Sequence, residues 1–477
     1  MGRSACLSRR SRFVVATERE SNEQAGNALL VAMLQEYYPA ISPKEGGSSA
    51  CRRGNSGMKA CSLGTLVTAL SRITFALTLA GCGGGGGGDS PVTPPPSTVV
   101  PPLTLPGPYA VGCSNVAQDF SRLAPGEDAT GYWEGSPSAS GAPRYATDLL
   151  ADPANTLSIT VTAPNDAGLY GSIAGTQVSY VVLACYPTGT ANPRADYPLP
   201  TGNVVPHMQT GAEQPLFADT AARYPVIAFS HGYGGSPISS KYFSVLSVFA
   251  SYGYIVVAPF HGDLRFSDLT IDKLSDAVAL LAHLNPFTTL QALRPRSMSA
   301  ALDLMLAHPQ WRDHIDATQI GGFGASLGGE TLMLMGGAGL TTSLGLSWTQ
   351  VTVDPRLKAA VGYVPYFGQP FLPAFGRDGH GLDGVTLPYL AISGTADTTA
   401  PIIVTTQGMA RLAGTRELVT LAGVTHAFDV ASTNDIYTWS LTFLDAQVRG
   451  NPVARQQLST MTSVAGGGDD SVAIPLR

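Results

Sequence analysis

The 477-residue sequence has few charged residues, since Asp, Glu, Lys and Arg together make up only 13% of it. The basic ones are concentrated early: residues 1–81 carry ten Lys and Arg against five Asp and Glu, whereas the remainder carries 18 against 29. Binding of nucleic acid needs a basic surface that neutralises phosphates. The acidic remainder therefore argues against nucleic acid as a partner.

The sequence also lacks the usual signatures of a bound metal. It contains no H-E-x-x-H, no paired C-x-x-C and no acidic cluster, and no internal repeat is visible. Several histidines have no partner at ligand spacing, so we expect structural roles for His207, His261, His283, His308 and His314. We expect neither a metal nor an organic cofactor.

One glycine-rich stretch has the spacing of a nucleotide-binding loop. Gly322, Gly324 and Gly328 form G-x-G-x-x-x-G. Dinucleotide fingerprints normally belong to the first strand–helix unit of a domain, and here several strand-like runs precede the glycines. We therefore do not expect these glycines to form a nucleotide-binding loop.

An apolar stretch that begins at Met58 is too short and too interrupted for a comfortable transmembrane helix. With Lys59 near its start, it has the pattern of an export signal. It ends in Leu79-Ala80-Gly81-Cys82, which resembles the lipobox of bacterial lipoproteins. This resemblance implies cleavage before Cys82 and attachment of lipid to it. An ordinary secretory signal with a chance cysteine is the alternative.

The segments around this signal suggest four parts of the chain. Residues 1–57 precede a plausible start at Met58, and we interpret them as a mis-assigned extension. Residues 58–81 form the expected lipoprotein signal peptide, and residues 82–107 form a tether rich in glycine and proline. Residues 108–477 form the expected catalytic domain. The residue after Cys82 is Gly83 and not Asp. By resemblance to the sorting of Gram-negative lipoproteins, the lack of Asp at this position favours the outer membrane over the inner membrane.

Cysteine is scarce after the expected cleavage point. Apart from Cys82, only Cys113 and Cys185 remain in the expected mature chain. In an oxidising compartment two such residues suggest one disulfide, which would pin the N-terminal segment to an early strand. Two buried free thiols are the alternative.

The domain shows strand-like runs that alternate with helical segments. LSITVTAP and VSYVVLACYP come first and look like the antiparallel opening strands of an α/β-hydrolase sheet. From Tyr224 onward, runs such as YPVIAFS, YIVVAPF and LPYLAISG are apolar and β-branched, as in strands buried on both faces. Alternation with helices predicts an α/β fold with a mostly parallel central sheet and helices on both faces.

Two excursions interrupt this alternation. Residues 263–296 separate a strand from its expected helix over residues 297–308, and residues 338–356 follow another helix. In this architecture such insertions commonly cap an active site, so we predict a cap for residues 263–296. Decoration of the surface is the alternative.

The motif Gly324-Ala325-Ser326-Leu327-Gly328 matches G-x-S-x-G between the strand-like QIGGF and a helix. A serine hydroxyl is a poor nucleophile unless a sharp turn exposes it beside a base. Small flanking residues allow this strand–turn–helix elbow to close tightly. The motif therefore predicts Ser326 as a catalytic nucleophile.

An acid and a base follow in the order that this fold uses. Asp397 comes after the strand LPYLAISG, and His426 comes after the strand in LVTLAG. His426 would take the serine proton, while Asp397 would hold the imidazole in the required tautomer. Weaker candidates for the acid and the base are Asp263, Asp383 and His380.

His231-Gly232 follows YPVIAFS and resembles the oxyanion-hole loop of α/β-hydrolases. The resemblance implies that the backbone N–H groups of Tyr233 and Leu327 stabilise a tetrahedral oxyanion. The imidazole of His231 is expected to be structural.

Several of these segments together resemble a known family. FSHGYGGSPISSKYFSVLSVFASYGYIVVAPFHGD, GFGASLGGE, ISGTAD and VTHAF are similar to platelet-activating-factor acetylhydrolase-like proteins and predicted dienelactone hydrolases. The resemblance covers about residues 175–450. Ala325 stands where a histidine is usual, and Ser326 stands where true dienelactone hydrolases have cysteine.

The resemblance implies hydrolysis of a carboxylic ester through an acyl-serine. Six aromatic residues near the motifs would suit an apolar, aromatic or polymeric ester, with a place in the core as the alternative: Tyr233, Phe260, Tyr363, Tyr366, Phe367 and Phe371. We expect an ester hydrolase attached to the membrane of a bacterial envelope by its lipid. The rival interpretation is a non-catalytic, lipid-anchored binding protein on a hydrolase scaffold.

Overall fold

The structure is a computed structural model, and it describes residues 98–114, 150–152, 154–198, 204–209, 213–267, 277–342, 347–369 and 372–477. Cys82 lies outside the described residues, together with the extension, the signal peptide and most of the tether. These parts therefore stay predictions. Within the described ranges, no helix is both long enough and apolar enough to cross a membrane.

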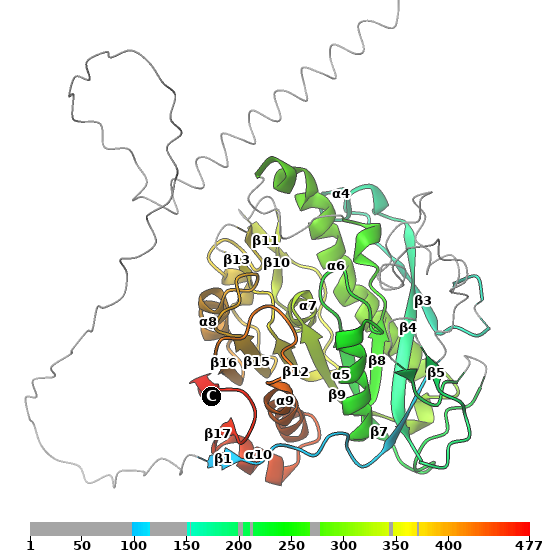
Figure 1. Ribbon diagram of the computed structural model, residues 1–477. Helices are drawn as coiled ribbons and strands as arrows, with labels where there is room; N and C mark the ends of the chain where they lie inside the picture. Colours follow the sequence, from blue (N-terminus) through cyan, green and yellow to red (C-terminus); the bar gives the residue numbers. More distant parts are fainter. Residues whose placement is uncertain are drawn as a thin grey trace, which may run out of the picture. The chain divides into compact units, whose positions relative to one another are not determined.

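A ten-stranded sheet forms the centre of the described domain (Figure 1). Its main path runs in the spatial order β18 (Asp470–Ile474), β16 (Arg416–Leu421), β15 (Tyr389–Gly394), β12 (Leu357–Tyr363), β9 (Ile315–Ala325), β7 (Tyr224–Ser230), β8 (Ile255–Pro259), β4 (Gln177–Thr188) and β2 (Ala110–Cys113). β3 (Ser158–Thr162) also pairs with β4. Pairing is parallel from β16 to β8 and antiparallel at both edges. The predicted, mainly parallel sheet with antiparallel opening strands is confirmed.

The parallel strands are continuous apolar runs because helices cover both of their faces. Along β7, Val226 and Ala228 pack into one core cluster, while Ile227 and Phe229 pack into the other. The first cluster lies against α6 (Ala277–Ala307), α7 (Leu327–Met335) and α8 (Ile402–Arg411). The second lies against α5 (Ser240–Ser251), α9 (Thr433–Gln447) and α10 (Pro452–Leu458). This mixed α/β architecture is compatible with an α/β-hydrolase fold.

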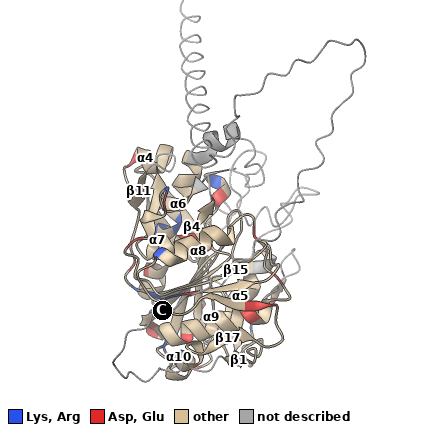
Figure 2. Cartoon of the chain, turned by 90° about the vertical axis from the view of Figure 1, so that its left-hand side faces the viewer, with Lys and Arg blue, Asp and Glu red and all other residues tan. Residues whose placement is uncertain are grey.

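Shorter elements complete the domain. α4 (Ala167–Tyr170) precedes β4, and β1 (Thr98–Val100) pairs with β17 (Met461–Val464) in parallel. Within the described ranges, three two-stranded antiparallel sheets are formed by β5 (Tyr197–Pro198) with β6 (Val204–Val205), β10 (Gly339–Thr342) with β11 (Ser347–Gln350), and β13 (Gly368–Gln369) with β14 (Leu372–Pro373). Charged residues are thinly scattered along the described elements (Figure 2).

The predicted cap needs a correction over part of its length. α6 begins at Ala277 and not near residue 297, and its residues Phe287, Leu290 and Leu293 are buried in the first core cluster. Residues 287–296 are therefore mostly part of a core helix. A cap formed by the earlier part of 263–296 stays a prediction, as does a cap formed by residues 338–356, which contain β10 and β11.

The folded domain also begins earlier than the expected boundary at residue 108. Val100 is buried in the second core cluster, and Leu103 and Leu105 pack against it. The N–H of Leu103 donates to Thr438 Oγ1 at 3.1 Å. Residues 98–107, which we call the N-terminal strap, are therefore docked on the domain. The predicted tether is thereby shortened to residues 82–97, which lie outside the described residues.

The structure contains a disulfide between Cys113 and Cys185, which lie opposite each other on the antiparallel strands β2 and β4. Both cysteines are fully buried. The crosslink spans 72 residues and thereby restricts the unfolded chain.

Replacing both cysteines with alanine is expected to lower the free energy of unfolding by about 2–4 kcal/mol, because the unfolded chain regains the entropy that the crosslink removes. Denaturant titration would measure the change. Wild-type protein with a reducing agent serves as the control and should approach the stability of the variant. Mass spectrometry that finds two alkylated thiols in the native, oxidised protein would contradict the pairing.

Candidate active site

Ser326 lies at the sharp turn between β9 and α7. Its backbone has φ 51° and ψ −118°, a strained conformation for a residue other than glycine. The turn is tight, because a Cβ built on Gly324 would lie 2.2 Å from the carbonyl oxygen of Gly328. One built on Gly328 would lie 1.9 Å from the carbonyl oxygen of Ser230. Gly324 and Gly328 are therefore required because other backbone atoms occupy the space that a side chain would need.

The three residues singled out as nucleophile, acid and base come together at one edge of the sheet. Ser326 follows β9, Asp397 follows β15 and His426 follows β16, so all three lie beyond the carboxyl ends of parallel strands. His426 Nε2 is 2.8 Å from Ser326 Oγ, and His426 Nδ1 is 2.7 Å from Asp397 Oδ2. The imidazole thus bridges the hydroxyl and the carboxylate.

Asp397 is fixed by its own loop. Its Oδ1 accepts hydrogen bonds from the backbone N–H groups of Thr399 and Ala400, both at 2.8 Å. The side chain is fully buried, whereas that of His426 is 22% exposed. Because Oδ1 is occupied by the loop, Oδ2 is directed to the imidazole. This arrangement can hold Nδ1 protonated and leave Nε2 as an acceptor for the Ser326 hydroxyl.

The loop after β7 lies against the serine. A Cβ built on Gly232 would lie 3.5 Å from the Cβ of Ser326 and 2.4 Å from the hydroxyl of Tyr242. Leu327 is the first residue of α7, where backbone N–H groups have no intrahelical acceptor. The loop containing Tyr233 and the N-terminus of α7 thus flank Ser326, as the sequence predicts.

Behind this loop lies a buried network that the sequence reasoning did not find. Arg294 of α6 forms an ion pair with Asp263 at 2.8 Å, and their side chains are 2% and 1% exposed. Burial alone would raise the pKa of Asp263, but the charge and hydrogen bonds of Arg294 outweigh it and hold this pKa below its usual value. Asp263 is therefore an ionised carboxylate that pairs with Arg294. It is not paired with a catalytic base.

Two neutral histidines belong to the same network. Burial, followed by the nearby charge of Arg294, lowers the pKa of His231 to about 4 and the pKa of His261 well below its usual value. His231 Nε2 accepts a hydrogen bond from the backbone N–H of His261 at 3.1 Å. His261 in turn contacts the hydroxyls of Ser230 and Ser297 at 2.9 and 3.0 Å. Both rings have structural partners, as expected for each.

Glu330, in the first turn of α7, is also buried. Burial raises its pKa to about 8, although the side-chain amide of Gln291 donates to its Oε1 at 2.7 Å. A raised pKa of this kind keeps the carboxyl protonated at neutral pH. Glu330 is thus a neutral group in the core below the serine.

The weaker candidates Asp383 and His380 lie elsewhere. They pair with each other at 2.6 Å across a short 3-10 helix at the surface, and Arg411 contacts both. His380 also lies 3.0 Å from Asp378. Asp383 and His380 are therefore bonded within this surface group. The acid and base that contact Ser326 are Asp397 and His426.

Most of the aromatic residues near the motifs are core residues. Phe260, Tyr363, Tyr366 and Phe367 are at most 5% exposed, and each belongs to one of the two core clusters. Phe371 lies outside the described residues. Tyr233 is partly buried, and its hydroxyl donates to the carbonyl of Ser267 at 2.9 Å. The structure therefore favours a core role over a substrate surface for the four buried rings.

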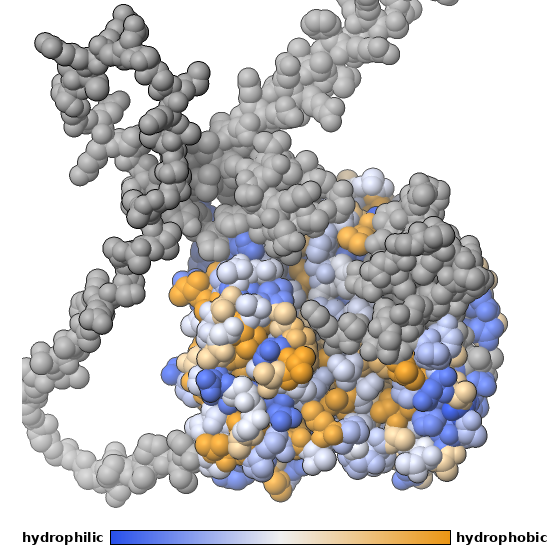
Figure 3. Space-filling model, in the orientation of Figure 1, coloured by the Kyte–Doolittle hydropathy of each residue, from blue (hydrophilic) through white to orange (hydrophobic). Residues whose placement is uncertain are grey.

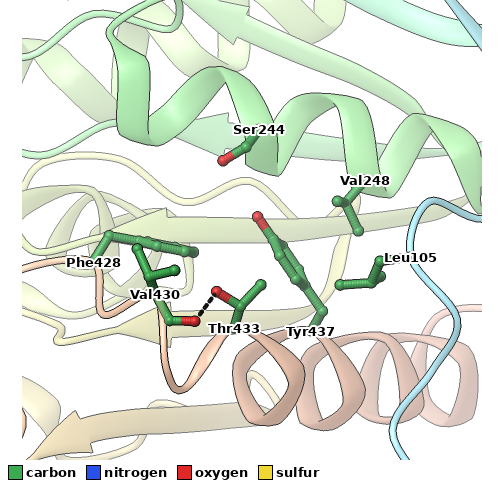
Figure 4. A pocket seen from close by; sticks show the side chains of 7 residues that line it. All are labelled: Leu105, Ser244, Val248, Phe428, Val430, Thr433 and Tyr437. Carbon is green, nitrogen blue, oxygen red and sulfur yellow. Dashed lines mark hydrogen bonds between the residues drawn. The ribbon is translucent and has the colours of Figure 1, made fainter. Parts of the chain in front are cut away.

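A pocket of about 360 Å³ lies between α5 and α9 (Figure 4). Apolar side chains line most of it, together with three hydroxyl-bearing ones: Leu105, Ser244, Val248, Phe428, Val430, Thr433 and Tyr437. Phe428 follows His426 by two residues, so one end of the pocket adjoins the loop that carries the imidazole. On the face shown in Figure 3, apolar residues form small areas among polar ones.

The described residues contain no group of three or more His, Cys, Asp or Glu side chains arranged to hold a metal ion. The groups that meet at Ser326 are its hydroxyl, the imidazole of His426 and the carboxylate of Asp397.

A comparison with models of protein families gives a match to part of the chain. A family model described as platelet-activating factor acetylhydrolase, isoform II, matches residues 201–273. This region contains β7, the following loop, α5 and β8, and it ends before Ser326. No curated protein matches the chain. The match supports a platelet-activating-factor-acetylhydrolase-like α/β-hydrolase family and, with it, a hydrolase that acts on esters.

Proposed function

We propose that this protein is a serine hydrolase of carboxylic esters in which Ser326 is the nucleophile. The observation that carries the proposal is the imidazole of His426, which lies within hydrogen-bonding distance of both Ser326 Oγ and Asp397 Oδ2. A serine hydroxyl becomes nucleophilic when an oriented base can take its proton. The family match supports an ester as the substrate.

In the proposed reaction, Ser326 Oγ attacks the ester carbonyl carbon and His426 Nε2 accepts the hydroxyl proton. The carbonyl oxygen becomes an oxyanion, which the N–H groups of Tyr233 and Leu327 stabilise. His426 then returns the proton to the departing alcohol, and an acyl-serine remains. Water attacks this acyl group with His426 again as the base, which releases the acid and restores Ser326. Asp397 stays ionised and stabilises the imidazolium.

The proposed substrate is a carboxylic ester with a modest acyl group, and lipid, aromatic and polymeric esters are the candidates to be compared. The described domain has few charged side chains, so a strongly ionic substrate would find few groups with which to form ion pairs. A panel of p-nitrophenyl esters of rising chain length, together with polyester films, would define the acyl range. A fluorophosphonate probe, which phosphonylates activated serines, should label the native protein at Ser326.

The probe also separates the proposal from its rival. A non-catalytic scaffold would neither take up the probe nor hydrolyse any ester of the panel. Heat-denatured protein is the control, because an unactivated serine does not react. Labelling of a peptide that lacks Ser326 would contradict the assignment of the nucleophile.

We also propose that the mature chain is anchored through lipid on Cys82, in the outer membrane of a bacterial envelope. The support is the sequence Leu79-Ala80-Gly81-Cys82 and the glycine- and proline-rich tether that follows it. One acyl chain gives only marginal, reversible attachment, whereas two or more anchor a protein stably. Attachment should therefore survive a wash with concentrated salt.

Replacing Cys82 with serine is expected to abolish lipidation, because serine lacks the thiol that receives lipid, and to leave either the unprocessed precursor or an unlipidated product. Mass spectrometry of the mature N-terminus and detergent partitioning would measure both effects. Cys61→Ser is the matched control and should leave both unchanged. An unaltered mature mass and unaltered partitioning of Cys82→Ser would instead indicate a plain secreted protein.

A further inference from the structure

The peptide unit between Gly232 and Tyr233 is held from behind. The carbonyl oxygen of Gly232 lies 2.8 Å from His231 Nδ1, 3.1 Å from Arg294 Nη2 and 3.2 Å from the backbone nitrogen of Gly235. His231 Nε2 accepts a backbone N–H, so the proton of this neutral ring is on Nδ1 and donates to Gly232. Three donors therefore fix the direction of one carbonyl.

The direction of this carbonyl determines that of a neighbouring N–H. The C=O of Gly232 and the N–H of Tyr233 belong to the same planar peptide unit, and in a trans peptide they point in opposite directions. Donors that hold the carbonyl on the side of Arg294 thus direct the Tyr233 N–H away from Arg294. This N–H is one of the two proposed oxyanion donors.

Arg294 and Asp263 hold the loop on both sides of that peptide unit. Arg294 Nη1 donates to the carbonyl of His231 at 2.9 Å, and Asp263 Oδ2 accepts the N–H of Gly234 at 3.0 Å. Two further bonds, from Arg294 Nε and Nη2 to the two oxygens of Asp263, lock the side chains together at 2.9 and 2.8 Å. Each of the three guanidinium nitrogens, Nε, Nη1 and Nη2, thus donates to an acceptor in the loop or in the carboxylate of Asp263.

A stabilising role alone does not account well for this pair. Removing two charges from water costs free energy that the attraction between them often fails to recover. The planar guanidinium of arginine nevertheless holds several N–H donors in a rigid fork, whereas the ammonium of lysine acts as a point charge. Here that fork contacts two successive carbonyls and a carboxylate at once.

We propose that Arg294, locked by Asp263, is a positioning residue that orients the Gly232–Tyr233 peptide unit so that its N–H meets the oxyanion. This inference rests on the proposed function of Ser326. It assigns a role in transition-state stabilisation to two side chains that do not touch the substrate.

Arg294→Lys tests the inference, because lysine keeps the buried charge beside Asp263 but loses the fork. We expect kcat/KM for p-nitrophenyl butyrate to fall about 10- to 100-fold, somewhat less than the loss on deleting an oxyanion donor, while KM changes little. Titration with the fluorophosphonate probe gives the concentration of reactive Ser326, so the rate is expressed per active site and partial unfolding cannot mimic the effect.

A trifluoromethyl ketone provides a second measurement that a purely structural role would not affect. Ser326 Oγ bonds to the ketone carbon and its proton passes to His426, so that the ketone oxygen becomes an oxyanion at the position of the transition state. The inhibition constant for Arg294→Lys should rise by the same factor as kcat/KM falls. Asp263→Asn, which unlocks Arg294, should show the same parallel change.

Arg356→Lys is the matched control. Arg356 also pairs with buried Asp354 and donates to a backbone carbonyl, but it precedes β12, at the edge of the sheet opposite Ser326. It should retain wild-type kinetics and inhibition. If Arg294→Lys keeps wild-type kcat/KM and inhibition per active site, or if neither site variant folds, the positioning role is overturned. A wild-type protein that does not react with the probe would instead overturn the proposed function.

Discussion

Ser326→Ala is expected to reduce ester hydrolysis by about 10⁴- to 10⁶-fold, because it removes the proposed nucleophile and leaves only binding and oxyanion stabilisation. The protein should remain folded, since alanine is smaller than serine and the hydroxyl contacts only His426 among the described side chains. Initial rates with p-nitrophenyl esters would measure the loss, and circular dichroism would confirm the fold.

Ser393→Ala is the control for that substitution. Ser393 is 1% exposed on β15, which β12 separates from β9 in the same sheet, and its hydroxyl has no hydrogen-bond partner within the described structure. Its removal should leave activity unchanged. Retention of more than about one per cent of activity in Ser326→Ala would point to another nucleophile, given the size of the expected loss.

Gly328→Ala is expected to have the largest effect on stability. The added methyl group would lie 1.9 Å from the carbonyl oxygen of Ser230, 2.6 Å from its carbon and 3.0 Å from the carbonyl oxygen of His231. These are backbone atoms of a central strand and of the loop beside Ser326, so no rotamer change relieves the overlap. We expect a loss of more than about 4 kcal/mol, in the range that marks severe local disruption, or a failure to fold.

Thermal unfolding and the yield of soluble protein would measure this effect. Gly189→Ala is the matched control, because a methyl group there would find its nearest neighbour 4.0 Å away. It should melt close to the wild type. A Gly328→Ala protein that melts with the wild type and hydrolyses esters normally would show that the elbow is not closed as tightly as described.

The sequence predicted those parts of the fold that local patterns determine. Buried parallel strands are continuous β-branched runs, so β7, β8 and β15 were recognisable without the structure. Ser326, Asp397 and His426 were also recognisable, because each follows such a strand and parallel strands present their carboxyl ends at one edge. Their contacts agree with that prediction.

The sequence did not predict contacts between distant segments that carry no pattern of their own. Asp263 and Arg294 are 31 residues apart, and the segment between them was interpreted as a cap. Two prolines, Pro286 and Pro295, lie inside α6 and obscured the helix, because proline normally interrupts the helical hydrogen-bond pattern. The buried aromatic residues were equally ambiguous, since an apolar ring suits a core and a binding surface alike.

The docked N-terminal strap decides where a shortened, soluble version of this protein should begin. A chain that starts at residue 108 would lose β1 and its pairing with β17, and it would uncover the apolar surface beneath Val100, Leu103 and Leu105. It would also lose the hydrogen bond from Tyr252 to the carbonyl of Thr104. Exposed apolar surface of this kind promotes aggregation. A soluble form for crystallisation should therefore start no later than residue 97, immediately before β1.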